Sequence, residues 1–281
     1  MDNFQKIIAK KKKELERKST GRKSIDSTMY YTKEESIQKI YQMLFKKAQI
    51  PKEYQDCSFS NFDIDFMPEN KSKVKELKDF ALNYDKYFRK TNTPQSVLLY
   101  SEKNGSGKTH IAVSIAKLIL WEYAKLLYEK NPFKYRIRGV ISDSINYLNA
   151  PVFFMSEKKY IWSRKRFTTD NESIIKYVSD CEKAFTQSEM IIYDDLFRSR
   201  DTDFFFDELE GIISQRYDDN KSFIFTTNIN ILAIDQIDPD ENPFSNRVNQ
   251  GRYLLSRIEK MTKPYLYQFK DYKDYRKDGI Y

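Results

Sequence analysis

The chain has 281 residues, of which 40% are hydrophobic and 15% aromatic, enough for one large buried core or a core with a smaller module. Its 49 Lys and Arg against 41 Asp and Glu give a net charge of +8, and one histidine with two cysteines excludes a Cys/His zinc finger, a haem motif and a disulfide framework. No stretch approaches the roughly 18 apolar residues of a membrane span, and no apolar run typical of a signal peptide follows the first lysines. We therefore expect a cytoplasmic protein with no membrane contact.

Nearly all the excess positive charge lies at the start of the chain, where residues 1–47 contain 13 Lys and Arg against 6 Asp and Glu. Phe4, Ile7, Ile8 and Leu15 have the spacing of one helical face. A second helix is expected after a capping box formed by Thr32 and Glu35, and Pro51 ends it. We interpret residues 1–49 as a basic helical N-terminal arm. Three roles stay open: an extension packed on its own domain, a docking element for a partner protein, or a nucleic-acid anchor.

Residues 50–281 alternate helical and strand-like patterns, which is typical of an α/β domain with a mostly parallel sheet and crossover helices. Within it, a short apolar strand at 97–100 is followed by a glycine-containing loop and then by an apolar helix from residue 111. This order of strand, loop and helix predicts a phosphate-binding loop.

The loop has the residues that phosphate binding requires. Glycines let backbone N–H groups turn inward around phosphates, Lys108 would reach the β and γ phosphates of ATP, and the Thr109 hydroxyl would hold Mg²⁺. The full motif has glycine where this chain has Glu102, whose side chain and charge are expected to weaken nucleotide binding. The residues expected to contact ATP are Asn104, Gly105, Ser106, Gly107, Lys108, Thr109 and His110.

Polar side chains end two further strands of the expected sheet. The apolar run 190–193 ends in Asp194 and Asp195, and the run 222–227 ends in Asn228. Ligands of open α/β sheets bind at the carboxyl ends of the strands, so these side chains should meet the phosphate loop. Asp194 would position Mg²⁺, Asp195 would polarise the attacking water, and Asn228 would contact the γ-phosphate or that water. The pattern predicts an ATPase.

This order of motifs resembles the AAA+ ATPases, and in particular the bacterial replicative helicase loaders of the DnaC and DnaI type together with the transposition ATPase IstB. The resemblance covers about residues 50–276. It rests on a leading segment at 50–54 and 59–62, a helix and sensor strand at 209–228, a Ser-Arg box at 255–258 and a closing motif at 274–276.

The resemblance implies a three-layer α/β/α AAA+ fold without a separate lid domain. It also implies that Asn228 acts as a sensor and that Arg257 acts as an arginine finger on the nucleotide of a neighbouring subunit. Arg216 and Arg252 would add to the same interface, so self-association is expected. The implied activity is slow, regulated ATP hydrolysis by a loader that binds single-stranded DNA and delivers a replicative helicase.

A basic and aromatic segment at 157–167 is the candidate for DNA contact. Five basic residues and three aromatic ones in eleven positions suit neutralisation of the DNA backbone together with base stacking. The alternative is a solvated amphipathic helix in which Tyr160, Ile161 and Phe167 face the core. The basic residues expected to contact DNA are Lys158, Lys159, Arg164, Lys165 and Arg166.

Two other functions remain open at this point. One is a transposition ATPase of the IstB type, which would bind duplex DNA and a transposase. The other is a non-hydrolysing adaptor that binds nucleotide without turnover, an alternative favoured by Glu102 and by Asp195 in a position that is often glutamate.

Overall fold

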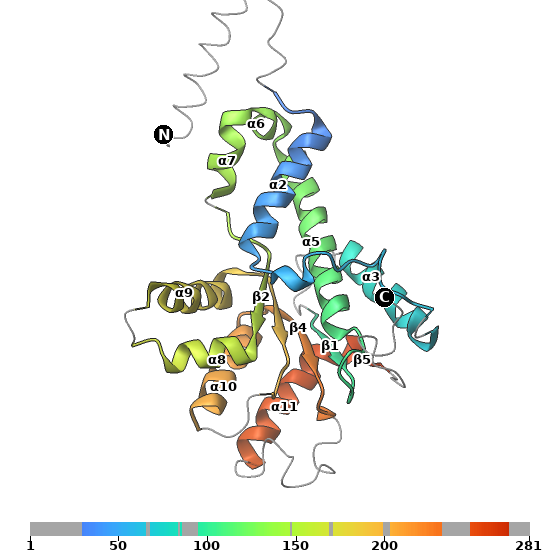
Figure 1. Cartoon of the computed structure of the whole chain (residues 1–281), viewed down its shortest axis with the longest axis vertical. Helices are drawn as coiled ribbons and strands as arrows, with labels where there is room; N and C mark the ends of the chain where they lie inside the picture. Colours follow the sequence, from blue (N-terminus) through green and yellow to red (C-terminus); the bar gives the residue numbers. More distant parts are fainter. Residues whose placement is uncertain are drawn as a thin grey trace, which may run out of the picture.

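A parallel sheet forms the centre of the structure (Figure 1). The computed structural model describes residues 30–65, 68–83, 85, 95–146, 148–168, 171–198, 203–231 and 248–269. Within them the strands are β1 (Val97–Tyr100), β2 (Val152–Ser156), β3 (Met190–Asp194), β4 (Ser222–Thr227) and β5 (Leu266–Gln268). They lie in the order β2-β3-β4-β1-β5, and each pairing is parallel. The expected α/β sheet is therefore confirmed.

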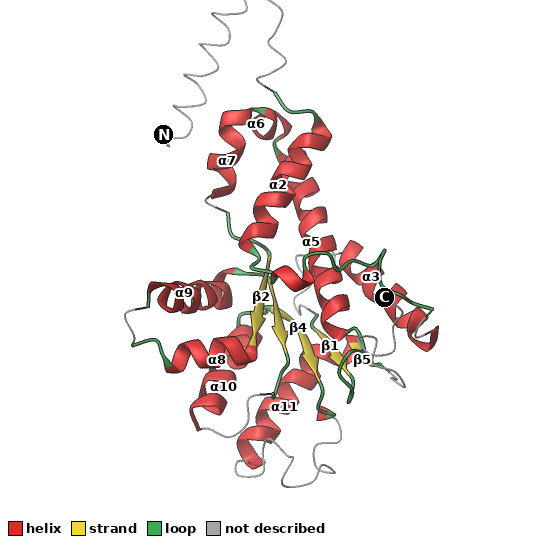
Figure 2. Ribbon diagram, in the orientation of Figure 1, coloured by secondary structure: helices red, strands yellow, loops and turns green. Residues whose placement is uncertain are grey.

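Helices cover both faces of this sheet (Figure 2). On one side lie α2 (Lys33–Lys47), α3 (Lys71–Leu82), α5 (Lys108–Lys130), α6 (Pro132–Arg136) and α7 (Arg138–Asn146). On the other lie α8 (Glu157–Lys165), α9 (Glu172–Gln187), α10 (Asp203–Asp218) and α11 (Val248–Thr262). Short 3₁₀ turns occur at Lys52–Tyr54, Pro68–Asn70 and Lys263–Tyr265.

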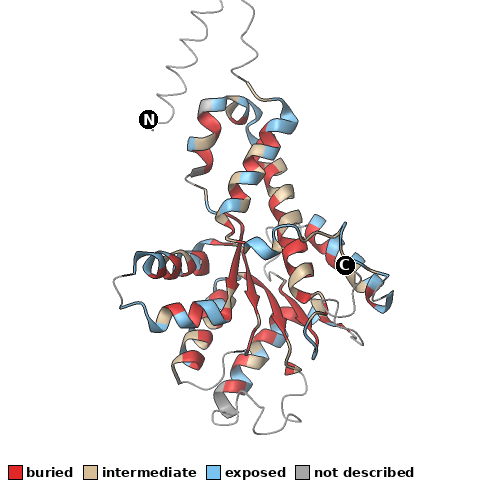
Figure 3. Cartoon of the chain, viewed as in Figure 1, coloured by how far each residue is buried: buried red, intermediate tan, exposed pale blue. Residues whose placement is uncertain are grey.

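Each face of the sheet has its own hydrophobic core, because successive side chains of a strand point to opposite faces. In β1, Val97 and Leu99 pack into the core beneath α5, and Leu98 packs into the core beneath α10. Every residue of β1, β3 and β4 is buried (Figure 3), as expected of parallel strands covered on both sides. The three-layer α/β/α arrangement is confirmed.

The second expected helix of the arm, α2, packs on its own domain. It begins at the predicted capping box, in which the Glu35 N–H donates to Thr32 Oγ1 over 3.1 Å and the Thr32 N–H donates to Glu35 Oε2 over 2.8 Å. Ile40 and Leu44 are fully buried in the core that contains α5. The first expected helix, with Phe4, Ile7, Ile8 and Leu15 on one face, lies outside the described residues, and docking of a partner or DNA by the arm at 1–49 stays a prediction.

The helices α6 and α7 lie beside α2 and the second half of α5, at the far end of the molecule from the lower edge of the sheet in Figure 1. The Tyr31 N–H donates to the Arg136 carbonyl over 2.8 Å. At the other end of α2, the Lys47 ammonium donates to the carbonyls of Ile145 at 2.8 Å and Leu148 at 2.6 Å. Burial lowers the pKa of Lys47. These contacts fix the connection between α5 and β2 against α2.

After β4, the described chain continues in α11, which packs against α10 and β1 and leads through a 3₁₀ turn to β5. The described residues 248–269 therefore pack on the sheet and form no separate lid. The closing motif at 274–276 lies beyond the described part. None of the described helices has the length and apolar character needed to cross a membrane.

Candidate functional site

The loop between β1 and α5 has the backbone shape of a phosphate cradle. Gly105 and Gly107 adopt left-handed conformations with φ of 79° and 82°. The positive φ favours glycine at position 107, and a Cβ there would lie 2.6 Å from the ring of Phe62, which would have to shift. The loop ends at the N-terminus of the 23-residue helix α5, which favours negative charge.

Lys108, the first residue of α5, is held inside this loop. It is only 6% exposed, and its Nζ donates to the Lys103 carbonyl at 3.0 Å and to Ser106 Oγ at 3.1 Å. A third contact reaches the Ser101 carbonyl at 3.3 Å. The ammonium group therefore lies at the centre of the cradle, where a bound phosphate would meet it.

Glu102 points away from this centre. Its carboxylate accepts a hydrogen bond of 2.8 Å from the Tyr100 hydroxyl, and the residue does not line the cavity in front of the loop. The geometry therefore gives no support to the expected weakening of nucleotide binding by Glu102.

The predicted residues from three strands meet in one cavity of about 330 Å³. The loop residues 104–110 form one wall, and Asp194, Asp195 and Asn228 face them from the ends of β3 and β4. Residues that the sequence did not assign to the site are also present. These are Arg198 and, from the segment after α2, Glu53, Tyr54, Cys57, Asn61, Phe62 and Asp63.

His110 ties that segment to α5. Its Nε2 lies 2.9 Å from the Ser58 carbonyl oxygen, and its ring meets the edge of Phe62 at a centroid distance of 5.3 Å. Burial lowers the pKa of His110, so the ring is neutral at pH 7. His110 lines the cavity as predicted, and its nitrogen holds the cavity wall in place.

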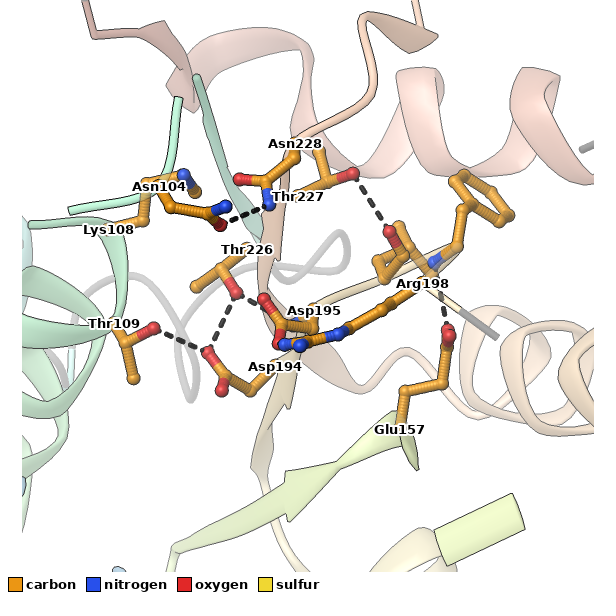
Figure 4. A network of polar contacts seen from close by, with 12 residues as sticks. Asn104, Lys108, Thr109, Glu157, Asp194, Asp195, Arg198, Thr226, Thr227 and Asn228 are labelled. Atoms are coloured by element: carbon orange, nitrogen blue, oxygen red, sulfur yellow. Dashed lines mark hydrogen bonds and ion pairs between the residues drawn. The ribbon is translucent and has the colours of Figure 1, made fainter. Parts of the chain in front are cut away.

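Asp194 is the most constrained acid of the site (Figure 4). Its Oδ1 accepts hydrogen bonds of 2.8 Å from the hydroxyls of Thr109 and Thr226, and the residue is 5% exposed. Burial, followed by the charge of Asp195, raises the pKa of Asp194 to about 6 against the opposing effect of the two hydroxyls.

The donor set at Asp194 fits Mg²⁺. The Thr109 hydroxyl and the Asp194 carboxylate bring hard oxygen atoms together beside the phosphate loop. The described residues contain no cluster of three Asp, Glu, His or Cys side chains that would hold a metal alone. Such a cluster is not required, because Mg²⁺ in nucleotide sites is held by one or two protein ligands, waters and phosphates.

Asp195 and Asn228 complete the far side of the cavity. Asp195 has a left-handed backbone with φ of 62°, and its N–H donates to Thr226 Oγ1 over 2.9 Å. Its carboxylate forms an ion pair with Arg198. Asn228 Nδ2 donates to Asn104 Oδ1 over 2.9 Å, while the buried Asn228 Oδ1 has no hydrogen-bond partner among the described residues. That oxygen is available to accept a hydrogen bond from water.

Neutralising Asp194 should stabilise the nucleotide-free protein at pH 7. We expect Asp194→Asn to raise the free energy of unfolding by about 1–3 kcal/mol, because a buried charge beside Asp195 is removed. Since the pKa of Asp194 is higher in the folded state than its usual 3.8, the folded wild type gains stability as the pH falls through 6.

The advantage of the Asp194→Asn variant should therefore shrink between pH 7 and pH 5. Urea unfolding of both proteins in EDTA at the two pH values measures this difference. A variant that is less stable than the wild type at pH 7 would contradict the expected electrostatic penalty.

The expected place of Arg216 at a subunit interface is wrong. Arg216 belongs to α10 and its side chain is fully buried. Its two terminal nitrogens donate to backbone carbonyls. The acceptors are Ala184 at 3.3 Å, Phe185 at 2.9 Å, Ser188 at 3.1 Å, Glu189 at 3.1 Å and Ser222 at 2.7 Å. The guanidinium therefore joins the C-terminal end of α9 to the starts of β3 and β4. It is not accessible to a neighbouring subunit.

The two other arginines expected at an interface lie on α11. Arg252 is exposed, and Arg257 is partly buried with its guanidinium 4.0 Å from the ring centre of Tyr253. Arg257 also donates to the Ser214 hydroxyl. Neither residue lines the cavity of its own chain. A role for Arg257 at the nucleotide of a neighbouring subunit remains a proposal.

Most of the basic segment at 157–167 forms α8, which has one face in the core and one in solvent. Tyr160 and Ile161 are buried, as the amphipathic alternative predicted, whereas Phe167 is exposed. Arg164 is paired with Glu208 at 2.9 Å and with Glu182 at 3.7 Å.

Four of the five basic residues of the segment 157–167 that are expected to contact DNA have exposed side chains. The Lys159 ammonium lies 4.0 Å from the ring centre of Tyr177, and the Arg166 guanidinium lies 4.3 Å from that of the exposed Trp162. The exposed basic residues are Lys158, Lys159, Lys165 and Arg166.

A larger cavity, of about 700 Å³, lies at the opposite edge of the sheet. It is lined by residues of α2, α9 and the start of β2, and it contains none of the motif residues. The smaller cavity is therefore assigned as the functional site because of the residues that line it, although the other cavity has the larger volume.

The parallel sheet, the phosphate loop between β1 and α5 and the acids at the end of β3 define a P-loop fold of the AAA+ class. The chain is similar to the crystal structure of the DnaC helicase loader, with 20% identity, a TM-score of 0.50, and coverage of 78% of this chain and 100% of that one. It is also similar to a putative primosome component from Streptococcus pyogenes serotype M3, with 13% identity, a TM-score of 0.51, and coverage of 81% and 95%. No family model matches the sequence, and no curated protein does. The resemblance to the helicase-loader type is confirmed at the level of the fold.

Proposed function

We propose that the protein is an ATPase that loads a replicative helicase onto single-stranded DNA. One observation carries the proposal: the phosphate loop, the Thr109–Asp194 pair, Asp195 and Asn228 all face one cavity. A site of this composition has a group for each requirement of ATP hydrolysis, namely phosphate binding, metal binding and orientation of water. Similarity in fold to the DnaC helicase loader supports the choice of partner.

Each residue has a distinct task in this proposal. The backbone N–H groups of 105–108 and the Lys108 ammonium bind the β and γ phosphates, and Thr109 with Asp194 holds Mg²⁺. The metal ion supplies neutralisation of phosphate charge. Asp195 accepts a hydrogen bond from the attacking water, and Asn228 holds the water or the γ-phosphate in position.

The proposed DNA surface is the exposed side of α8. There Trp162 offers a stacking surface that is 47% exposed, and four exposed basic side chains surround it. Arg164 is excluded from this surface as a main contact because it is partly buried and paired with Glu208. Stacking on an aromatic ring combined with backbone neutralisation favours single strands over duplex DNA.

Self-association is proposed through Arg257, which would act on the nucleotide of a neighbouring subunit. A guanidinium delivered in trans stabilises the negative charge that develops on the transferred phosphate. The basic N-terminal arm at residues 1–49 is proposed to dock the helicase or DNA.

The test is ATP turnover by the full chain without DNA, with single strands and with duplex, beside Lys108→Ala and Arg257→Ala. We expect single strands to stimulate the wild type most and both variants to be inactive. An equal mixture of the two variants should recover part of the activity, because one supplies an intact phosphate loop and the other supplies Arg257.

The other outcomes of this experiment separate the alternatives. Stimulation by duplex and not by single strands favours a transposition ATPase. ATP binding without turnover under every condition favours a non-hydrolysing adaptor. Failure of the mixed variants to recover activity, with each variant folded and able to associate, contradicts action of Arg257 in trans.

A further inference from the structure

Arg198 holds the carboxylate that the proposed mechanism uses to orient water. It follows Asp195 by three residues, and its N–H donates to the Asp195 carbonyl over 3.0 Å, closing a tight turn at the end of β3. Its guanidinium forms an ion pair with Asp195 Oδ2. Both residues line the cavity in front of the phosphate loop (Figure 4). The pair raises the pKa of Arg198.

The two partners differ in how firmly they are fixed. The backbone of Asp195 is anchored by the hydrogen bond to Thr226 Oγ1, and its side chain is 24% exposed. The side chain of Arg198 is 58% exposed and has several rotatable bonds. If the ion pair opens, the arginine is the partner that moves.

A bound triphosphate would compete for this arginine. Among the described residues that line the cavity, Lys108 and Arg198 are the lysine and arginine side chains, and Lys108 is enclosed by the loop. A guanidinium binds phosphate oxygens through two parallel hydrogen bonds and prefers the partner with more charge. A γ-phosphate carries more negative charge than a single carboxylate, whereas a diphosphate has no γ-phosphate to offer.

We propose that Arg198 senses the nucleotide state in cis. With ADP or no nucleotide it pairs with Asp195 and blocks one of the oxygens needed to orient water. With a triphosphate it moves to the γ-phosphate and releases the carboxylate. The inference rests on the proposed function, because it needs a nucleotide in this cavity. It assigns to Arg198 the distinction between ATP and ADP.

Nucleotide affinity tests the proposal without reliance on turnover. Fluorescent derivatives of ADP and of a non-hydrolysable ATP analogue are titrated with the full chain in Mg²⁺, and fluorescence anisotropy gives the Kd. We expect Arg198→Ala to weaken binding of the triphosphate about tenfold and to change ADP binding less than twofold. Arg198→Lys should keep part of the preference, and Arg138→Ala, an exposed arginine on α7 that does not line the cavity, serves as the matched control.

A double-mutant cycle with Asp195→Asn shows whether the two residues compete as proposed. Alone, Asp195→Asn should tighten triphosphate binding, because Arg198 is no longer held. In the Arg198→Ala background, the same change should have no such effect.

Equal losses of ADP and triphosphate affinity in Arg198→Ala, or no loss at all, would overturn the proposal. If the wild type binds neither nucleotide, the proposed function itself fails. These two failures are therefore distinguished within one experiment.

Discussion

Replacing Lys108 with alanine is expected to lower ATP turnover by at least about 100-fold, the cost typical of removing one preorganised group that stabilises charge in a reacting site. The Lys108 ammonium is placed by the carbonyls of Ser101 and Lys103 and by Ser106 Oγ, so its position does not depend on the arrival of the nucleotide. Steady-state phosphate release with single-stranded DNA present measures the effect.

The control for Lys108→Ala is Lys103→Ala, because the Lys103 side chain comes from the same loop and does not line the cavity. This control should keep most of the activity. Thermal unfolding of both variants separates a catalytic effect from loss of the loop structure. Turnover of folded Lys108→Ala within a few-fold of the wild type would show that this cavity is not the site of ATP hydrolysis.

Replacing Arg216 with methionine is expected to destabilise the protein by about 3–5 kcal/mol, because five backbone carbonyl groups, most of them buried, lose the hydrogen bonds of the guanidinium together. Burial lowers the pKa of Arg216 to about 9, which still leaves it protonated at pH 7. Methionine keeps an apolar chain of similar length, so the main loss is that of the donors. Urea unfolding followed by circular dichroism measures the free energy.

The exposed Arg252→Met on α11 is the matched control for Arg216→Met and should change stability by less than about 0.5 kcal/mol. Arg216→Lys should recover only part of the loss, since one ammonium cannot reach five acceptors spread over residues 184–189 and Ser222. If Arg216→Met and Arg252→Met lowered the free energy of unfolding equally, the buried hydrogen bonds of Arg216 would contribute no more to stability than an exposed side chain.

The sequence predicts the phosphate loop and the strand ends because their chemistry depends on short spacing. Gly105, Gly107 and Lys108 lie within four consecutive residues, and Asp194 directly follows an apolar run. The parallel sheet then brings the carboxyl ends of β1, β3 and β4 to one edge, whatever the connections between them. Local pattern and topology are sufficient for this half of the site.

The other half of the site depends on contacts between distant residues. Phe62 packs on Gly107, and Ser58 bonds to His110, across about 50 residues of chain. The resemblance marked that leading segment, but no spacing rule shows which wall of the cavity it forms. Arg198 could have been noticed as a cation three residues after Asp195, although its partner is fixed by the turn.

Arg216 was misplaced for a different reason. Its place at an interface was implied by the resemblance, and a charged residue on a helix is normally exposed. Its acceptors are backbone carbonyls at the end of α9, just before β3 and at the first residue of β4. Sequence patterns reveal the spacing of side chains, but they do not predict where backbone carbonyls from distant segments come together.

One hydroxyl group makes the two acids of the site dependent on each other. Thr226 on β4 donates its single proton to Asp194 Oδ1 and accepts the N–H of Asp195 on the same oxygen. Any ligand that binds Asp194 Oδ1 competes with the Thr226 hydroxyl proton for that oxygen. If the hydroxyl then rotates, its lone pairs turn relative to the Asp195 N–H. A ligand bound at Asp194 would thus change the hydrogen bond that holds the backbone of Asp195. The residue that connects them, Thr226, is one that no nucleotide-binding motif specifies.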